Sequence, residues 1–154
     1  MRNLIVLFAL SLGLAYGQGP RITPEQRQEI LDYKLSMARA NQIFTALDAM
    51  TKYVVSLPDL ASVMAKQAKM TPAERLASVE NDTKAMAILK QNGLTAKEYL
   101  IGVPALRWAI WLAEGRNGNP EVIASPGNLA FAKANLTQLK PRLDVADGVS
   151  GAHN

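Results

Sequence analysis

The chain has 154 residues, a length typical of one domain, and 49% of them are hydrophobic against 19% charged. This balance allows a buried core and excludes a disordered polypeptide. The net charge of +4 arises from charges of both signs spread along the chain, without the basic run that would indicate a nucleic-acid partner. The absence of cysteine excludes disulfides, thiolate metal sites and covalently attached haem.

The first 17 residues, "MRNLIVLFALSLGLAYG", have the features of a signal peptide. Arg2 supplies a positive charge, an apolar run follows from Leu4 to Ala15, and Ala15 and Gly17 are the small residues that a signal peptidase accepts. We expect cleavage after Gly17 and export to the periplasm or the medium. A buried first helix or a membrane anchor is the alternative, but a bilayer-spanning helix needs about 20 apolar residues.

Three short stretches share the form of a helix start: "ITPEQ", "MTPAE" and "LTAKE". In each, Thr23, Thr71 or Thr95 is followed three residues later by Gln or Glu. This is the spacing of a capping box, in which each side chain hydrogen-bonds the backbone amide of the other residue. In two of the three a proline follows the threonine, at a position where a helix needs no N–H. We expect these three threonines to be helix caps.

Helical periodicity follows these starts in chain order. The pattern predicts a long helix from Met37 to Leu57, a short piece after Pro58, a helix from Pro72 to Gly93, and a last helix over residues 129–143. No window alternates like a β-strand. We therefore predict an all-α protein, a compact bundle of four to five helices.

The domain organisation follows from the same reading. A linker over residues 18–22 leads into one helical domain over residues 23–143, and the glycine-containing end over residues 144–154 is expected to be a flexible tail.

The stretch "LTAKEYLIGVPALRWAIWLAEG" is predicted to be the central helix. From Tyr99 to Leu112 it is almost wholly apolar, but at 1.5 Å per residue this covers only about 21 Å, too short for a membrane span. A helix that is apolar on all sides is buried among others. Pro104 should kink it near residues 100–103, and Gly102 should let a neighbouring helix approach. Pairing with a second subunit is the alternative.

Groups suited to catalysis or cofactor binding are scarce. His153, the only histidine, lies in the predicted tail, where it lacks the fixed position that a general base or a haem ligand needs. Neither Glu80 with Asp82 nor Asp144 with Asp147 has the pattern of a tuned acid–base pair, and solvated charges are the favoured interpretation. We expect no catalytic residue, no metal and no cofactor.

The methionines raise the question of a copper(I) site, because thioethers are soft ligands. They are widely spaced along the chain and fall on or near the apolar stripes, so core packing is favoured. The residues considered are Met37, Met50, Met64, Met70 and Met86.

Four aromatic residues are the candidates for the wall of an apolar pocket: Trp108, Trp111, Tyr99 and Phe131. The two tryptophans lie three residues apart on one edge of the predicted central helix, as a pocket wall requires. The same side chains fill a core without any ligand, and we favour the core. If they do line a pocket or an interface, the partner is an apolar small molecule or a second subunit.

Three segments resemble a group of small exported bacterial all-helical proteins of unknown function: "DYKLSMARANQIFTALDAMTKY", "AILKQNGLTAKEYLIGVPAL" and "SPGNLAFAKANLTQL". The shared features are a helix start at Leu35-Ser36, a G-L-T-x-x-E-Y helix from Gly93, and a terminal helix with Asn128, Phe131 and Asn135. The resemblance implies an all-helical exported fold and no particular activity. The two asparagines are expected to hydrogen-bond loop backbone.

A second, more local likeness concerns "ITPEQRQEI", which is similar to the L-T-x-x-Q elements of small periplasmic stress chaperones. The chain departs from that pattern at "MTPAE", where Glu74 replaces glutamine. We expect an exported, non-enzymatic binding or envelope-maintenance protein. A chaperone-like protein is the alternative, followed by an enzyme that uses only carboxylates, which needs Glu80, Asp82 or Glu98 buried in a cleft.

Overall fold

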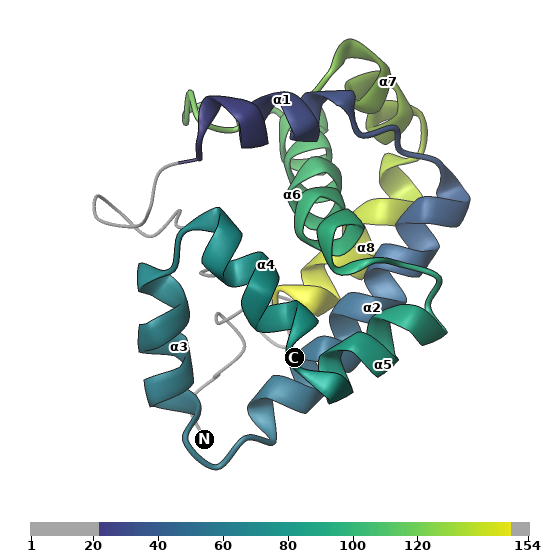
Figure 1. The fold of residues 1–154 in the computed structure, drawn as a ribbon. Helices are drawn as coiled ribbons and strands as arrows, with labels where there is room; N and C mark the ends of the chain where they lie inside the picture. The colour runs from purple at the N-terminus through teal and green to yellow at the C-terminus, as the bar shows by residue number, and fades with distance from the viewer. Residues whose placement is uncertain (1–21, 149–154) are drawn as a thin grey trace.

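The computed structural model describes residues 22–148, which form eight α-helices and no strand (Figure 1). The helices are α1 (Pro24–Asp32), α2 (Met37–Val55), α3 (Leu60–Lys69), α4 (Pro72–Glu80), α5 (Thr83–Gln91), α6 (Ala96–Ala113), α7 (Pro126–Ala134) and α8 (Leu136–Ala146). The all-α prediction is confirmed. The predicted signal peptide, most of the linker and His153 lie outside the described residues.

The predicted count of four to five helices is wrong, because two predicted helices are each divided in two and because the "ITPEQ" start and the short piece after Pro58 form separate helices, α1 and α3. Asp82 interrupts the predicted helix after Pro72, since its Oδ1 accepts hydrogen bonds of 3.0 Å from the amides of Lys84 and Ala85 and so caps a new helix. Asn135 separates α7 from α8 in the same region where one helix was expected. Apolar periodicity runs through both junctions and therefore does not reveal them.

The predicted caps are found at all three threonines. Thr71 and Thr95 form complete capping boxes with Glu74 and Glu98. Thr23 accepts only the amide of Gln26, at 3.2 Å, and begins α1. These starts are local in sequence, which is why the three-residue spacing was enough to predict them.

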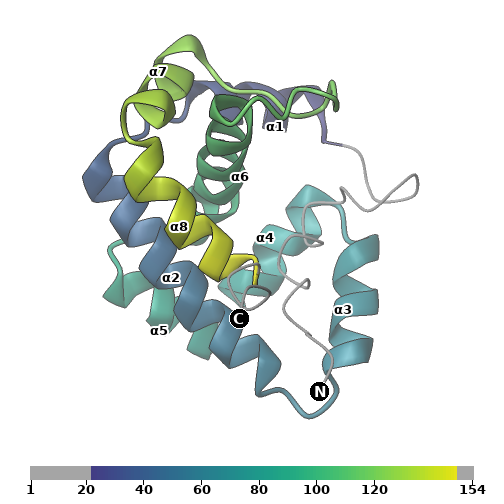
Figure 2. The same cartoon turned by 180° about the vertical axis from the view of Figure 1, so that it is seen from behind.

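Helix α6 is the centre of the fold. Figure 1 shows it among the other helices, with α1 and α7 at one end and α3 standing apart from it, and Figure 2 shows α8 running beside α2. All residues from Ile101 to Ile110 are buried, as predicted for a central helix. The helix continues past Pro104, and the predicted kink stays a prediction.

Two close approaches fix the segment around Tyr33, one from α6 and one from α7. A Cβ atom at Gly102 would lie 2.9 Å from the hydroxyl of Tyr33 and 3.0 Å from Cδ1 of Ile43, so the predicted close approach at this glycine is confirmed. Asn128 in α7 donates to the carbonyl of Tyr33 at 2.6 Å and accepts from the amide of Leu35 at 3.0 Å. This side chain therefore holds the loop between α1 and α2, as expected of an asparagine that bonds loop backbone.

The C-terminal boundary of the domain lies further along the chain than predicted. Helix α8 continues to Ala146, and Asp147 contacts Arg107 in α6, so residues 144–147 belong to the fold.

Asn135 also differs from expectation, because its side chain donates to the carbonyl of Phe131 at the end of α7, at 2.8 Å, and not to loop backbone.

Candidate functional site

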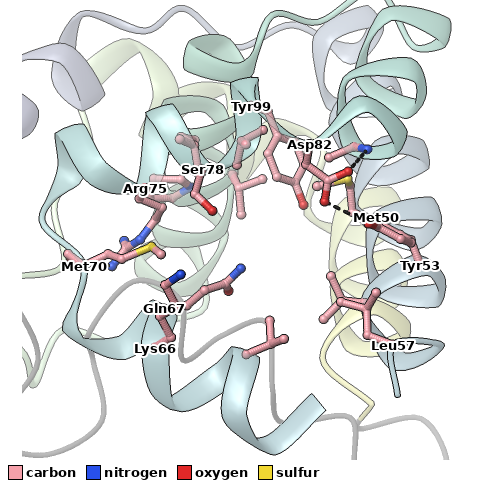
Figure 3. A pocket seen from close by; sticks show the side chains of 17 residues that line it. Met50, Tyr53, Leu57, Lys66, Gln67, Met70, Arg75, Ser78, Asp82 and Tyr99 are labelled. Atoms are coloured by element: carbon pink, nitrogen blue, oxygen red, sulfur yellow. Dashed lines mark hydrogen bonds between the residues drawn. The ribbon is translucent and has the colours of Figure 1, made fainter. Parts of the chain in front are cut away.

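A cavity of about 360 Å³ lies on one side of α6 (Figure 3). Its walls come from the last turns of α2, the inner side of α3, the middle of α4, the start of α5 and the middle of α6. The volume falls within the range of small-molecule sites, about 300–1,000 Å³. The cavity exists because α3 stands at the edge of the fold and buries none of its residues (Figure 1).

Most of the wall is apolar. Met50 and Val54 face the cavity from α2, and Leu100, Val103 and Pro104 face it from α6. Pro104 has no N–H, so the backbone carbonyl of Leu100 lacks the donor that it would have in a regular helix. Both residues lie on the side of α6 that faces the cavity. The wall therefore combines aliphatic surface with a small number of polar groups, the usual composition of a ligand site.

Tyr99 is the most deeply buried polar group of this wall. It is 3% exposed, and its hydroxyl has no hydrogen-bond partner among the described residues. Burial raises the pKa of this phenol well above its ordinary value, and the positive charge of Arg107 opposes that shift. The hydroxyl is therefore neutral and able to donate. A buried polar group left without a partner costs about 1–3 kcal/mol in the free energy of folding.

Arg75 is the second buried polar group. It is 8% exposed, its Nε has no partner, and its one hydrogen bond, from Nη2 to the carbonyl of Met70, is long at 3.5 Å. Burial lowers the pKa of Arg75, but a guanidinium stays charged in proteins. No carboxylate within residues 22–148 forms an ion pair with it. Arginine is rarely buried without such a partner.

Among residues 22–148, Asp82 is the only acidic residue of the cavity wall, and both of its oxygens are occupied. Oδ1 caps α5, and Oδ2 accepts a hydrogen bond of 2.8 Å from the hydroxyl of Tyr53 (Figure 3). This bond raises the pKa of Tyr53. Asp82 is thus a structural group that joins α2 to α5, and it has no second carboxylate beside it for acid–base chemistry.

The other two acids considered for a carboxylate enzyme lie elsewhere. Glu80 and Glu98 border a second, more open hollow between α5 and the start of α6. Glu80 is exposed, and Glu98 is held by the amide of Thr95 at 2.9 Å and by Arg39 at 3.0 Å. These bonds lower the pKa of Glu98, with the Thr95 amide as the main cause. A carboxylate stabilised in this way is a poor general base at neutral pH.

The four aromatic candidates do not form one pocket. Tyr99 lines the cavity, whereas Trp108 is 0% exposed and packs in a separate cluster with Ile30 and Val122. Trp111 is half-buried, with the guanidinium of Arg116 at 5.9 Å from the centre of its ring.

Phe131 is half-buried against the main core. Tyr99 is therefore the only one of the four among the residues that line the described cavity.

Of the five methionines considered for a copper(I) site, Met50 and Met70 line the cavity and the other three do not. Over residues 22–148, no group of three or more His, Cys, Asp or Glu side chains is placed to hold a metal ion. In the same range, no helix combines the length and the apolar character that crossing a membrane requires.

Sequence reasoning missed the cationic side of the cavity. Arg75 follows directly on the "MTPAE" start and precedes Leu76, and nothing in that spacing distinguishes a buried arginine from a solvated one. Lys66 also lines the cavity, from the exposed helix α3. Their convergence depends on how α3 and α4 stand against α6.

No family model, no curated protein and no solved structure was found to match this chain.

Proposed function

We propose that the protein is a non-enzymatic binding protein that takes an apolar small molecule into the cavity beside α6. The observation that supports this most strongly is the guanidinium of Arg75, a buried donor group that has no ion-pair partner among residues 22–148 and lies in a mostly apolar wall. Such a donor is costly in an empty core and useful in a ligand site. Asp82, the single acid that the described residues contribute to the wall, is occupied by capping α5, which argues against a carboxylate enzyme at this place.

The test is binding of N-phenyl-1-naphthylamine, a neutral probe whose fluorescence rises in apolar surroundings. We expect saturable binding to the purified protein. Ser78 lines the cavity from α4, and its neighbour Ala77 is exposed, so the chain offers a matched pair of variants. Ser78→Trp fills the cavity and should abolish binding, whereas Ala77→Trp should leave it unchanged. Equal binding by the two variants would place the probe elsewhere.

Export is the second part of the proposal and depends on the letters of the first 17 residues. The protein recovered from the cell envelope or the medium should begin with Gln18-Gly19-Pro20. An intact Met1 on protein from the cytoplasm would contradict export.

A chaperone-like role remains the alternative, with "ITPEQ" as its only support. In the structure these residues cap and begin α1, which accounts for the same letters without a chaperone function.

A further inference from the structure

The charged residues of the cavity wall carry a net positive charge, and a ligand that is only apolar would leave this charge without a partner. Of the described residues that line the cavity, Lys66 and Arg75 are cationic, and Asp82 is the only anion. Asp82 already accepts three hydrogen bonds, from Tyr53 and from the first amides of α5. Its charge is therefore committed to the α2–α5 junction, and the cationic side of the cavity has no counter-ion within the described residues.

Arg75 shows this imbalance most clearly because it is buried. Transferring a charged group out of water is expensive unless it is paired. In the structure the guanidinium has one long bond to a backbone carbonyl, and its Nε has none. Most of the N–H donors of the Arg75 guanidinium, which can bind a carboxylate or a phosphate through two parallel hydrogen bonds, are thus unused.

The cationic and apolar parts of the wall lie on different sides of the cavity. Figure 3 shows Arg75, Met70 and Lys66 together, where α3 meets α4. Met50 and Leu57 lie across the cavity on the α2 side, and Val103 contributes from α6. Asp82 and Tyr53 are on the α2 side as well, but they bond each other and the start of α5. A ligand that matches both sides has a charged end and an apolar body.

We propose that the ligand is a single-chain amphiphile with an anionic head group, bound with its head at Arg75 and Lys66 and its chain against α2 and α6. This inference rests on the proposed binding function and adds the chemical class of the ligand. The net positive charge of the three charged wall residues favours a monoanion, and the exposed Lys66 marks the side from which the head group enters.

The experiment is displacement of N-phenyl-1-naphthylamine from the full purified protein by three ligands of equal chain length: decanoate, decanol and decylammonium. We expect decanoate to displace the probe at a concentration about 10- to 100-fold lower than decanol, the range of a charge-assisted hydrogen bond. Decylammonium should be the weakest. Equal displacement by decanoate and decanol, or stronger displacement by decylammonium, would overturn the proposal.

Two variants locate the head group. Arg75→Met keeps an unbranched apolar stem and removes the charged guanidinium, so it should abolish the advantage of decanoate over decanol while the neutral probe still binds. Lys66→Met removes an exposed cation that the fold does not need, and it should reduce the same advantage severalfold. Lys69→Met is the matched control, because Lys69 is exposed on α3 and is not part of the cavity wall. If Lys69→Met acts like Lys66→Met, the effect is one of net charge and the proposed head-group site is wrong.

The source of the anion is distinguished by one further ligand, a lysophosphatidylglycerol, which carries its charge on a phosphodiester. Preference for decanoate identifies a free acid, and preference for the lysolipid identifies a lipid head group. Both outcomes support an anionic amphiphile. Failure of the neutral probe to bind at all would instead overturn the proposed binding function itself.

Discussion

Arg107 in the middle of α6 donates a hydrogen bond of 2.7 Å to Oδ1 of Asp147, which lies just beyond the end of α8. The guanidinium is 2% exposed, and its Nε and Nη1 have no partner among the described residues. The pair therefore joins the central helix to the last one across 40 positions of sequence. Its carboxylate belongs to the stretch that the sequence suggested was a flexible tail.

Removing this carboxylate should destabilise the fold. Asp147→Ala leaves a buried charge without its one partner, and we expect a loss of about 3 kcal/mol in the free energy of unfolding. Asp147→Asn keeps an acceptor oxygen and should cost much less at neutral pH. Urea unfolding measures both. Asp48→Ala is the control, because its pair with Lys52 is exposed and should contribute little.

The same pair has a predicted pH dependence. Burial raises the pKa of Asp147 by more than Arg107 lowers it, so the folded protein binds a proton here more tightly than the unfolded chain. The contribution of this carboxyl group to the free energy of unfolding is then full below about pH 4, the ordinary pKa of an aspartate. It declines as the pH rises through the higher pKa of the folded state. Wild type should gain stability relative to Asp147→Asn on acidification. The opposite trend would mean that the ion pair outweighs burial.

Asn128 should be a further point of weakness. Its amide satisfies the carbonyl of Tyr33 and the amide of Leu35 together, so Asn128→Ala leaves two backbone groups without partners. We expect a loss of about 1–3 kcal/mol and faster hydrogen exchange at the Leu35 amide. Asn135→Ala, which removes a bond within one helix, should have a smaller effect and leave exchange at Leu35 unchanged. Equal effects on that exchange rate would show that the loop is held by something else.

Two helical glycines allow a matched test of close packing. Gly102→Ala adds a methyl group within about 3 Å of Tyr33 and Ile43, and overpacking should outweigh the roughly 1 kcal/mol gain in helix propensity. Gly127→Ala meets nothing within 4 Å and should be neutral or stabilising. Thermal unfolding compares the two. In a Tyr33→Phe background, which removes the nearest atom, Gly102→Ala should cost less. An unchanged cost would place the strain at the ring carbon Cζ of residue 33 or at Cδ1 of Ile43, both 3.0 Å away.

The helix caps differ in how completely they are formed. Thr95→Ala removes a full capping box at the start of the central helix and should cost about 1 kcal/mol. Thr23→Ala removes a single bond and should cost less. Urea midpoints measure both, and equal, negligible effects would mean that the cap of α6 contributes nothing to the fold.

Local signals explain which parts of the structure could be predicted from the sequence. The capping boxes at Thr71 and Thr95 depend on residues three apart, and Gly93 has φ +69° directly after α5, as expected for a glycine that ends a helix. The burial of α6 follows from its apolar composition alone.

The remaining features depend on contacts between segments that are far apart in the chain. Asp147 meets Arg107 only because α8 packs beside α6, and Arg75 is buried only because of how α4 packs. The cavity is a gap between helices whose separate apolar stripes predict full packing. Periodicity shows which face of a helix is apolar, but it does not show how well the facing helix fills the space opposite.

The two tryptophans should behave differently, although they lie on the same edge of α6. Trp108 has no exposed surface, so Trp108→Ala should cost about 3–5 kcal/mol, whereas Trp111→Ala at a half-buried position should cost less. Fluorescence separates the residues without truncation. In Trp111→Phe the remaining Trp108 should emit in the blue and resist iodide, and in Trp108→Phe the remaining Trp111, beside the cationic Arg116, should be quenched. Because Trp108 is covered by the chain's own helices, its spectrum should not change across a dilution series. A spectrum that reddens on dilution would mean that a second subunit completes the cover of α6.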